Sequence, residues 1–179
     1  MADLNVNSIG DASGGNTASI NGYCDLFEYK DGALYWKQKR SNVAAGSFAG
    51  SKTANGYLTV SIKKKRILAH RIIYAMFHGF MPAFVDHING DKTDNRIENL
   101  REATLYTNGW NRPSNKNSQS QIKNVCWVEK NNKWFVQLMA NKKRVVSKYF
   151  EDLELAELVA IEARDKYHGS FANHGAQYV

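Results

Sequence analysis

The stretch FVDHINGDKTDNRIENLREATLYTNGWN, residues 84–111, places an acid and a histidine side by side and surrounds them with asparagines. A surface loop has no need of this combination. Phosphodiester hydrolysis does, because it requires a hard cation to stabilise charge on the phosphate and the leaving oxygen, and a base to deprotonate water. We therefore take this stretch as a candidate hydrolytic site.

Each part of that chemistry has a candidate residue here. Asp86 is an oxygen ligand of the kind that Mg²⁺ or Mn²⁺ accepts, and the amide oxygen of Asn108 can be a second ligand. Histidine suits a general base near neutral pH, which gives His87 that role, and Asn99 is placed to hold its ring. Asn111 lies three residues after Asn108 on nearly the same helical face, so it is the alternative second ligand.

Ordinary turn chemistry is the competing explanation for the same residues. An Asp-His pair before Asn89-Gly90 is compatible with a simple hairpin, and asparagines are frequent in loops. Asn95 is interpreted as such a turn residue. The pair by itself does not decide between the two explanations, but Asn99 and Asn108, in order and with a helix, favour the hydrolytic site.

Three predicted elements must position these side chains. VDHINGD is typical of a strand that enters a turn, TDNRIENL of a loop with one helical turn, and LREA of a second short strand. Thr104 can cap a helix that carries LYTNGWN. Since adjacent residues on a strand point to opposite faces, Asp86 and His87 can serve one site only where the strand end is twisted or irregular.

The residues before this unit predict two hairpins and a helix. Residues 26–39 alternate around an Asp31-Gly32 turn, and strands at 57–62 and 66–69 flank a lysine-rich turn. HRIIYAMFHGF indicates a short buried helix that Gly79 closes. We expect phosphate contacts from the basic turn, namely from Lys64, Lys65 and Arg66.

At the start of that helix, His70 and Arg71 fit two roles equally well. They can contact phosphate at the helix N-terminus, or form a packed histidine beside an ion-paired arginine. The other histidines are expected at surfaces or helix ends, outside catalysis: His78, His168 and His174.

The composition of the whole chain favours an acidic partner. The chain has 179 residues, enough for one medium domain or two small ones, and a formal net charge of +7. No apolar run reaches the roughly 20 residues of a membrane-spanning helix, and the first residues lack the features of a signal peptide. Cys24 and Cys126 are far apart and form no CxxC pair, so we expect neither a structural zinc nor a disulfide framework.

A second module is predicted after a linker rich in Ser, Asn and Gln. VCWVEKNNKWFVQLMANKKRVVSKYF indicates three strands joined by tight turns, and EDLELAELVAIEARDKYHG a helix that ends at Gly169. Between residues 111 and 149, nine basic residues face one acid, Glu129, whereas the helix is mostly acidic. A basic sheet covered on one face by an acidic helix would present its other face to phosphates.

The stretch DHINGDKTDNRIENLREAT resembles the HNH family of endonucleases, the ββα-metal nucleases, and in particular their phage and intron-encoded homing branch. GYLTVSI and LAHRIIYAMFHG resemble the leader of those enzymes, so the resemblance covers about residues 25–112. It implies that Asp86 binds the metal, His87 activates the water and Asn99 orients His87. The usual third histidine is replaced by an asparagine, assigned to Asn108, which implies one Mg²⁺ or Mn²⁺ rather than Zn²⁺.

The stretches NVCW, KWFVQL, KYF and AELVAIEARDKYHGSFAN resemble the ethylene-response-factor (Apetala-type) DNA-binding domain, over about residues 122–174. This implies a sheet laid in the major groove. Cys126 stands where plant members often place a base-reading arginine, so the base contacts are not carried over. Gln137 can read adenine, whereas lysines mostly contact phosphate. The candidate contacts of this module are Trp127, Lys133, Gln137, Lys143, Arg144 and Lys148.

These features predict an α+β protein with an HNH (ββα-metal) core preceded by β-hairpins and joined by a linker to a three-stranded antiparallel sheet plus helix. The expected boundaries are a flexible arm at 1–22, a nuclease domain at 23–112, a linker at 113–121 and a DNA-binding domain at 122–179. The predicted function is a site-specific, homing-type endonuclease that nicks double-stranded DNA. We expect a monomer, with a dimer as the alternative, in the cytoplasm of a bacterial or phage-infected cell and without membrane association.

Two other functions compete with this one. The first is a sequence-specific DNA-binding regulator whose nuclease core is inert, and the second is an RNA-binding module that stacks bases on Trp and Tyr. A regulator has no reason to keep all four of Asp86, His87, Asn99 and Asn108, and the aromatic residues mostly alternate as core residues do.

Overall fold

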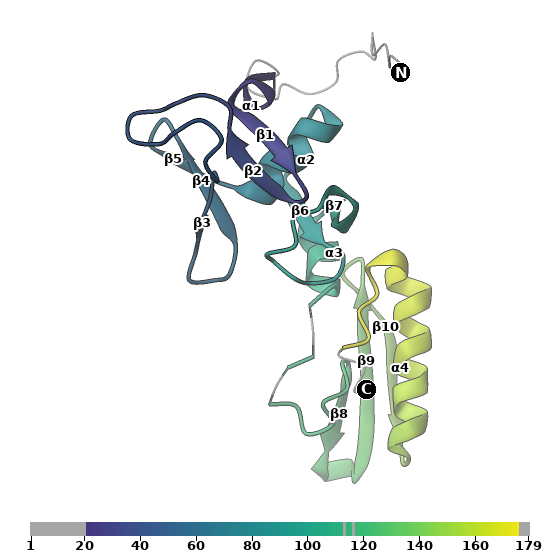
Figure 1. Ribbon diagram of the computed structural model, residues 1–179. Helices are drawn as coiled ribbons and strands as arrows, with labels where there is room; N and C mark the ends of the chain where they lie inside the picture. The colour runs from purple at the N-terminus through teal and green to yellow at the C-terminus, as the bar shows by residue number, and fades with distance from the viewer. Residues whose placement is uncertain (1–20, 113, 116, 176–179) are drawn as a thin grey trace.

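A computed structural model describes residues 21–112, 114–115 and 117–175, so most of the predicted arm at 1–22 lies outside the described residues. The described part is a mixed α/β structure with four small antiparallel sheets (Figure 1). Within these ranges, no helix combines the length and the apolar character needed to cross a membrane.

The first part of the chain forms two small sheets packed against one helix. The predicted hairpins are confirmed: β1 pairs with β2 around Asp31-Gly32, and β4 pairs with β5 around the lysine-rich turn. The predicted helix is also confirmed, and it ends at Gly79, whose N–H donates to the carbonyl of Ala75 and whose left-handed φ of 74° turns the chain out of the helix. The elements are α1 (Asn21–Leu26), β1 (Phe27–Lys30), β2 (Ala33–Trp36), β3 (Ser51–Lys52), β4 (Leu58–Ile62), β5 (Lys65–Leu68) and α2 (Ala69–His78).

A single apolar core connects these elements. Ile72 and Ile73 of α2 are fully buried, and they pack with Phe27 and Leu34 of the first hairpin. The same cluster includes Val85, which carries the core into the next strand. The strand that bears Asp86 and His87 is therefore held in place by packing against the apolar face of α2.

The strand, connection, strand and helix predicted for residues 84–111 are present. β6 (Phe84–His87) pairs antiparallel with β7 (Leu100–Ala103), with Asp86 opposite Arg101. A short 3₁₀ turn, η2 (Ile97–Asn99), precedes β7, and α3 (Leu105–Trp110) follows it.

The last part of the chain is a three-stranded antiparallel sheet in the order β10-β9-β8, covered by one long helix. Its apolar contact joins Val125 and Val136 of the sheet to Ala156 and Ala160 of the helix. A bulge lies between Arg144 and Val146 in the third strand. The elements are β8 (Val125–Val128), η3 (Glu129–Asn131), β9 (Lys133–Ala140), β10 (Lys143–Phe150), α4 (Leu153–His168) and η4 (Gly169–Phe171).

The C-terminal end of α4 lies beside α3, as Figure 1 shows. The ring of His168 stacks on Trp110 at 4.2 Å between centroids, and Lys142 Nζ lies 5.5 Å from the centre of the Tyr106 ring. Lys123 Nζ donates to the carbonyl of Trp110. The sheet-and-helix part is thus docked on the helix that follows β7.

Candidate active site

Asp86 and His87 form the buried end of β6. Their exposed fractions are 7% and 4%. The ladder ends at His87, whose carbonyl accepts a hydrogen bond from Gly90 N at 2.9 Å in the turn that follows. This irregular strand end lets two adjacent residues serve one cavity of about 470 Å³. The lining residues are Tyr57, Val85, Asp86, His87, Gly90, Lys92, Asn108, Asn111 and Arg112.

The carboxylate of Asp86 is held mainly through one of its two oxygens. Oδ2 accepts from Arg101 Nε at 2.9 Å and Nη2 at 2.7 Å, and from Asn111 Nδ2 at 3.0 Å. Oδ1 accepts a single longer bond, from the same Asn111 nitrogen at 3.2 Å. Oδ1 is therefore the oxygen with coordinating capacity left. Arg101 was not singled out from the sequence, although the predicted strand pairing would have placed it opposite Asp86.

The ring of His87 is held by Asn95. His87 Nε2 and Asn95 Oδ1 are 2.9 Å apart, and Asn95 is only 2% exposed. An amide oxygen can only accept, so Nε2 carries the hydrogen and the lone pair lies on Nδ1. The sequence predicts a turn residue at Asn95, because no signal in a single sequence separates it from the other asparagines of this loop.

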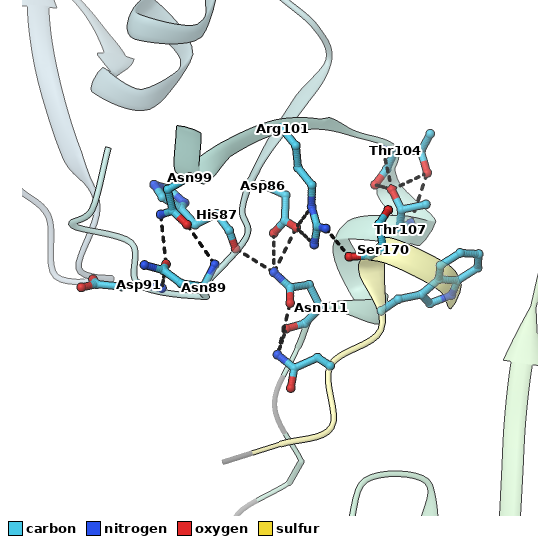
Figure 2. Close-up of polar contacts among 12 residues, drawn as sticks. Asp86, His87, Asn89, Asp91, Asn99, Arg101, Thr104, Thr107, Asn111 and Ser170 are labelled. Carbon is cyan, nitrogen blue, oxygen red and sulfur yellow. Dashed lines mark hydrogen bonds and ion pairs between the residues drawn. The ribbon is translucent and has the colours of Figure 1, made fainter. Parts of the chain in front are cut away.

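Asn99 closes the loop that follows His87, as Figure 2 shows, and does not hydrogen-bond to its ring. Its Oδ1 accepts from Asn89 N at 3.0 Å. Its Nδ2 donates to Asn89 Oδ1 at 3.0 Å and to the carbonyl of Asp94 at 2.7 Å. The structure thus gives Asn99 a contact with the loop backbone, and it gives the contact with the ring to Asn95.

His70 lies beneath the site as a packed histidine. Its ring meets that of His87 edge-on, with centroids 4.8 Å apart, and it is 3% exposed. Burial, and then the nearby charges of His87 and Arg71, lowers the pKa of His70 to about 3, so the ring is neutral near pH 7. Arg71 Nη2 donates to the carbonyl of Pro82 at 2.9 Å, and neither residue lines the cavity.

Helix α3 presents both candidate asparagines to the cavity. Thr104 caps it as predicted: its Oγ1 accepts from Thr107 N at 3.1 Å, and Thr107 Oγ1 accepts from Thr104 N at 2.8 Å. The side chain of Asn108 lines the cavity and makes no hydrogen bond with the described residues. The amide of Asn111 is committed, since its Nδ2 also donates to the carbonyl of His87 at 2.7 Å.

The cavity is also lined by two cations that were not among the site residues predicted from the sequence, Lys92 and Arg112. Both are exposed, and Lys92 Nζ lies 4.9 Å from the centre of the Tyr57 ring. The basic residues selected at the β4–β5 turn are exposed but do not line this cavity: Lys64, Lys65 and Arg66. In the part of the chain that the structure describes, no three side chains of His, Cys, Asp or Glu are grouped as a metal site.

Strand pairing divides the six candidate DNA contacts of the second sheet between its two faces. Trp134 and Val136 face α4, so their cross-strand partners Trp127 and Lys148 lie on the helix side. Lys143, opposite Ala140, is on that side as well. The opposite face, called the open face below because α4 does not cover it, carries the other three candidates, which are Lys133, Gln137 and Arg144. Gln137 is half-buried there, in a cavity that Trp110 and Ser118 also line.

Comparisons with known proteins give two matches. A family model described as HNH endonuclease matches residues 68–109, a range that includes Asp86, His87 and Asn108 but ends before Asn111. Protein 3.8 of Escherichia phage T7 is 31% identical over 91 residues, which are 50% of this chain and 73% of the T7 protein. No solved structure gives a significant match.

Proposed function

The chain belongs to the HNH endonuclease family, and we propose that it is a DNA endonuclease that hydrolyses phosphodiester bonds with one divalent metal ion at Asp86 and with His87 as the general base. One observation carries the proposal. A buried carboxylate and a buried histidine end the same strand and line one cavity. The same cavity is lined by Asn108, whose amide makes no hydrogen bond with the described residues, and by two cations, Lys92 and Arg112. Such a cavity suits an anionic substrate.

The donor set fits Mg²⁺ or Mn²⁺. Asp86 Oδ1 and Asn108 Oδ1 would hold the ion, with water and phosphate oxygens as its remaining ligands, and both donors are the hard oxygens that these metals prefer. Asn111 is less suited, because its Nδ2, not its oxygen, faces Asp86. The ion would stabilise the negative charge that develops on the phosphate and the leaving oxygen.

The residues of the chain would supply the proton transfer and the positioning. Lys92 and Arg112 bind the phosphate at the rim of the cavity. A water molecule loses a proton to His87 Nδ1, and its oxygen forms a bond to phosphorus while the bond from phosphorus to the leaving oxygen breaks. The leaving oxygen takes a proton from solvent. Asn95 keeps the basic nitrogen available, because it holds the hydrogen on Nε2.

The C-terminal sheet is proposed to bind and select double-stranded DNA, in the manner of the ethylene-response-factor domains that it resembles. Its open face offers Lys133, Gln137 and Arg144. Gln137 can read a base edge, and the two cations can contact phosphate. With one candidate active site in the described part of each chain, we propose a homing-type enzyme that nicks one strand as a monomer in the bacterial or phage-infected cell.

An inert DNA-binding regulator is the second candidate, and one contact favours it. Arg101 neutralises the charge of Asp86 through two hydrogen bonds, which weakens the attraction of this carboxylate for a cation. The two candidates differ in whether DNA is cut when it is bound.

Plasmid cleavage tests the proposal. Supercoiled plasmid is incubated with the wild type, His87→Ala or His78→Ala in Mg²⁺, Mn²⁺ or EDTA, and His78→Ala removes an exposed histidine of α2 as a matched control. We expect nicked circles with the wild type and His78→Ala in either metal, and none with EDTA or with His87→Ala. If the wild type binds DNA in a gel shift but does not cleave it, the endonuclease proposal is wrong and the regulator is the better account.

A further inference from the structure

The segment that follows α4 reaches back to the active site. Arg101 Nη1 donates to the carbonyl of Ser170, and the guanidinium carbon of Arg101 lies 3.7 Å from the centre of the Phe171 ring. Asn173 Nδ2 donates to the carbonyl of Asn111 at 2.8 Å and to its Oδ1 at 3.2 Å. These contacts join residues of the second module to two residues of the first, 62 positions away along the chain in the case of Asn111.

Arg101 and Asn111, which these contacts join to the second module, also bind Asp86 and His87. Arg101 holds Asp86 Oδ2, and Asn111 Nδ2 bridges the carboxylate of Asp86 and the carbonyl of His87 (Figure 2). Ser170 and Phe171 thus act on Asp86 through Arg101, and Asn173 acts on both catalytic residues through Asn111. None of the three lines the cavity.

Asn173 reinforces the orientation of the Asn111 amide. Its donated hydrogen bond requires the oxygen of Asn111 on its side, and this leaves the nitrogen on the side of Asp86. If the amide turned over, its oxygen would face the Asp86 carboxylate and the His87 carbonyl, and three acceptors would repel one another. Asn173 is itself oriented, because its Oδ1 accepts from Gly175 N at 2.8 Å.

Phe171 and Ser170 fix the plane of the Arg101 guanidinium. An aromatic face under the guanidinium and a carbonyl on Nη1 confine the group, so that its other nitrogens meet Asp86 Oδ2. The charge of Arg101 is then kept on Oδ2, and Oδ1 is left for a cation.

We propose that Phe171 and Asn173 are positioning residues of the active site, through which the module that carries the basic sheet completes the site at Asp86 and His87. The inference rests on the proposed endonuclease function. Replacing a residue that hydrogen-bonds to a metal ligand or orients it typically lowers metal affinity or activity by about 10- to 100-fold.

Four variants of the full chain test this inference. Asn173→Asp keeps the acceptor for Gly175 and replaces the donor to Asn111 with a charged acceptor, and Asn173→Ala removes both groups. Phe171→Leu removes the aromatic face, whereas Phe171→Tyr keeps it and serves as the conservative rescue. Each variant is measured for Mn²⁺ affinity by electron paramagnetic resonance, for single-turnover plasmid cleavage, and for DNA affinity by gel shift.

We expect Asn173→Asp, Asn173→Ala and Phe171→Leu to lose about 10- to 100-fold in Mn²⁺ affinity or in the single-turnover rate. DNA affinity should stay at the wild-type level in these variants. Phe171→Tyr should keep both the Mn²⁺ affinity and the single-turnover rate of the wild type. A purely structural role would instead lower DNA affinity in parallel with cleavage, and that result would overturn the inference.

Wild-type Mn²⁺ affinity and cleavage in Asn173→Asp and Phe171→Leu would overturn it as well, with the endonuclease function intact. A wild type that neither binds Mn²⁺ nor cleaves DNA would refute the proposed function, and the inference would fall with it. The behaviour of the wild type therefore tells the two failures apart.

Discussion

Asn108 and Asn111 lie on the same side of α3 but are in different chemical situations. Asn108 lines the cavity, and its side chain makes no hydrogen bond with described residues. Asn111 uses Nδ2 for Asp86 and His87 and Oδ1 for Asn173. Because the nitrogen of Asn111 faces Asp86 and its oxygen faces Asn173, Asn108 is the proposed metal ligand and Asn111 a support for Asp86.

Replacing each asparagine by aspartate separates these roles. Asn108→Asp adds a negative charge beside the proposed metal, so we expect Mn²⁺ affinity to rise by about tenfold. Asn111→Asp places a carboxylate against the Asp86 carboxylate, so we expect Mn²⁺ affinity to fall by about tenfold and the protein to lose stability. Electron paramagnetic resonance titration measures both. A fall with Asn108→Asp and a rise with Asn111→Asp would reverse the assignment.

The buried ring of His70 predicts a loss of stability in acid. Its pKa in the folded protein is about 3 and that of an unfolded histidine is about 6.5, so only the unfolded chain takes up a proton between these values. The contribution of the neutral His70 ring to the free energy of unfolding is complete above pH 6.5 and is lost progressively as the pH falls toward 3. At pH 5 the loss is up to about 2 kcal/mol.

Urea unfolding at pH 7.5 and pH 5 measures this effect. His70→Gln, which does not titrate, should lose less stability between the two pH values than the wild type, although it is less stable at pH 7.5. Burial also lowers the pKa of His168, so part of the acid loss should remain in the variant. An equal loss in both proteins would contradict the packed, neutral state of His70.

Among the elements, the second sheet has two faces with different surroundings. Arg144 and Lys148 belong to the same strand, yet Arg144 is opposite Met139 on the open face and Lys148 is opposite Val136 on the helix side. Lys148 also lies near Glu162 of α4 in a small cavity between strand and helix. The two residues therefore form a matched pair for testing which face binds DNA.

We expect Arg144→Ala to weaken DNA binding and to reduce the slope of log affinity against log salt by about 1, because one cationic contact is lost. Lys148→Ala removes the same charge from the helix side and should leave the slope close to that of the wild type. Gel shifts over a series of salt concentrations give both slopes. A larger effect from Lys148→Ala would show that DNA does not use the open face.

Local signals explain which elements were predictable from the sequence. The Asp31-Gly32 turn, the end of α2 at Gly79, the cap at Thr104 and the three strands before α4 each depend on a few neighbouring residues. The adjacent Asp86 and His87 were recognisable for the same reason. Such features are set by backbone preference and local hydrogen bonding, so one sequence contains them.

The supports of the site were not predictable, because they depend on contacts between distant residues. Asn95 was indistinguishable from its neighbouring asparagines until its burial against His87 was seen. Asn173 and Phe171 lie beyond α4, and their approach to Asn111 and Arg101 follows from how the two parts of the chain dock. No periodicity or spacing in the sequence encodes that docking.

In the molecule as a whole, the cavity and the basic sheet are held in one arrangement. The stack of His168 on Trp110, the contact of Lys142 with Tyr106 and the hydrogen bonds of Asn173 all tie the second module to α3 or its end. If the sheet binds DNA while it is docked in this way, the active site meets the DNA backbone at a constant distance from the sequence that the sheet binds.

Sequencing of the cleaved ends tests the central claim, that one docked unit both binds and cuts DNA. Genomic DNA is digested with the wild type in Mg²⁺, and the sequences around all new ends are aligned, with a His87→Ala digest as the background. We predict a shared sequence motif at one constant distance from the cut, on one strand. Ends that share no motif, or a motif at variable distances from the cut, would contradict the claim.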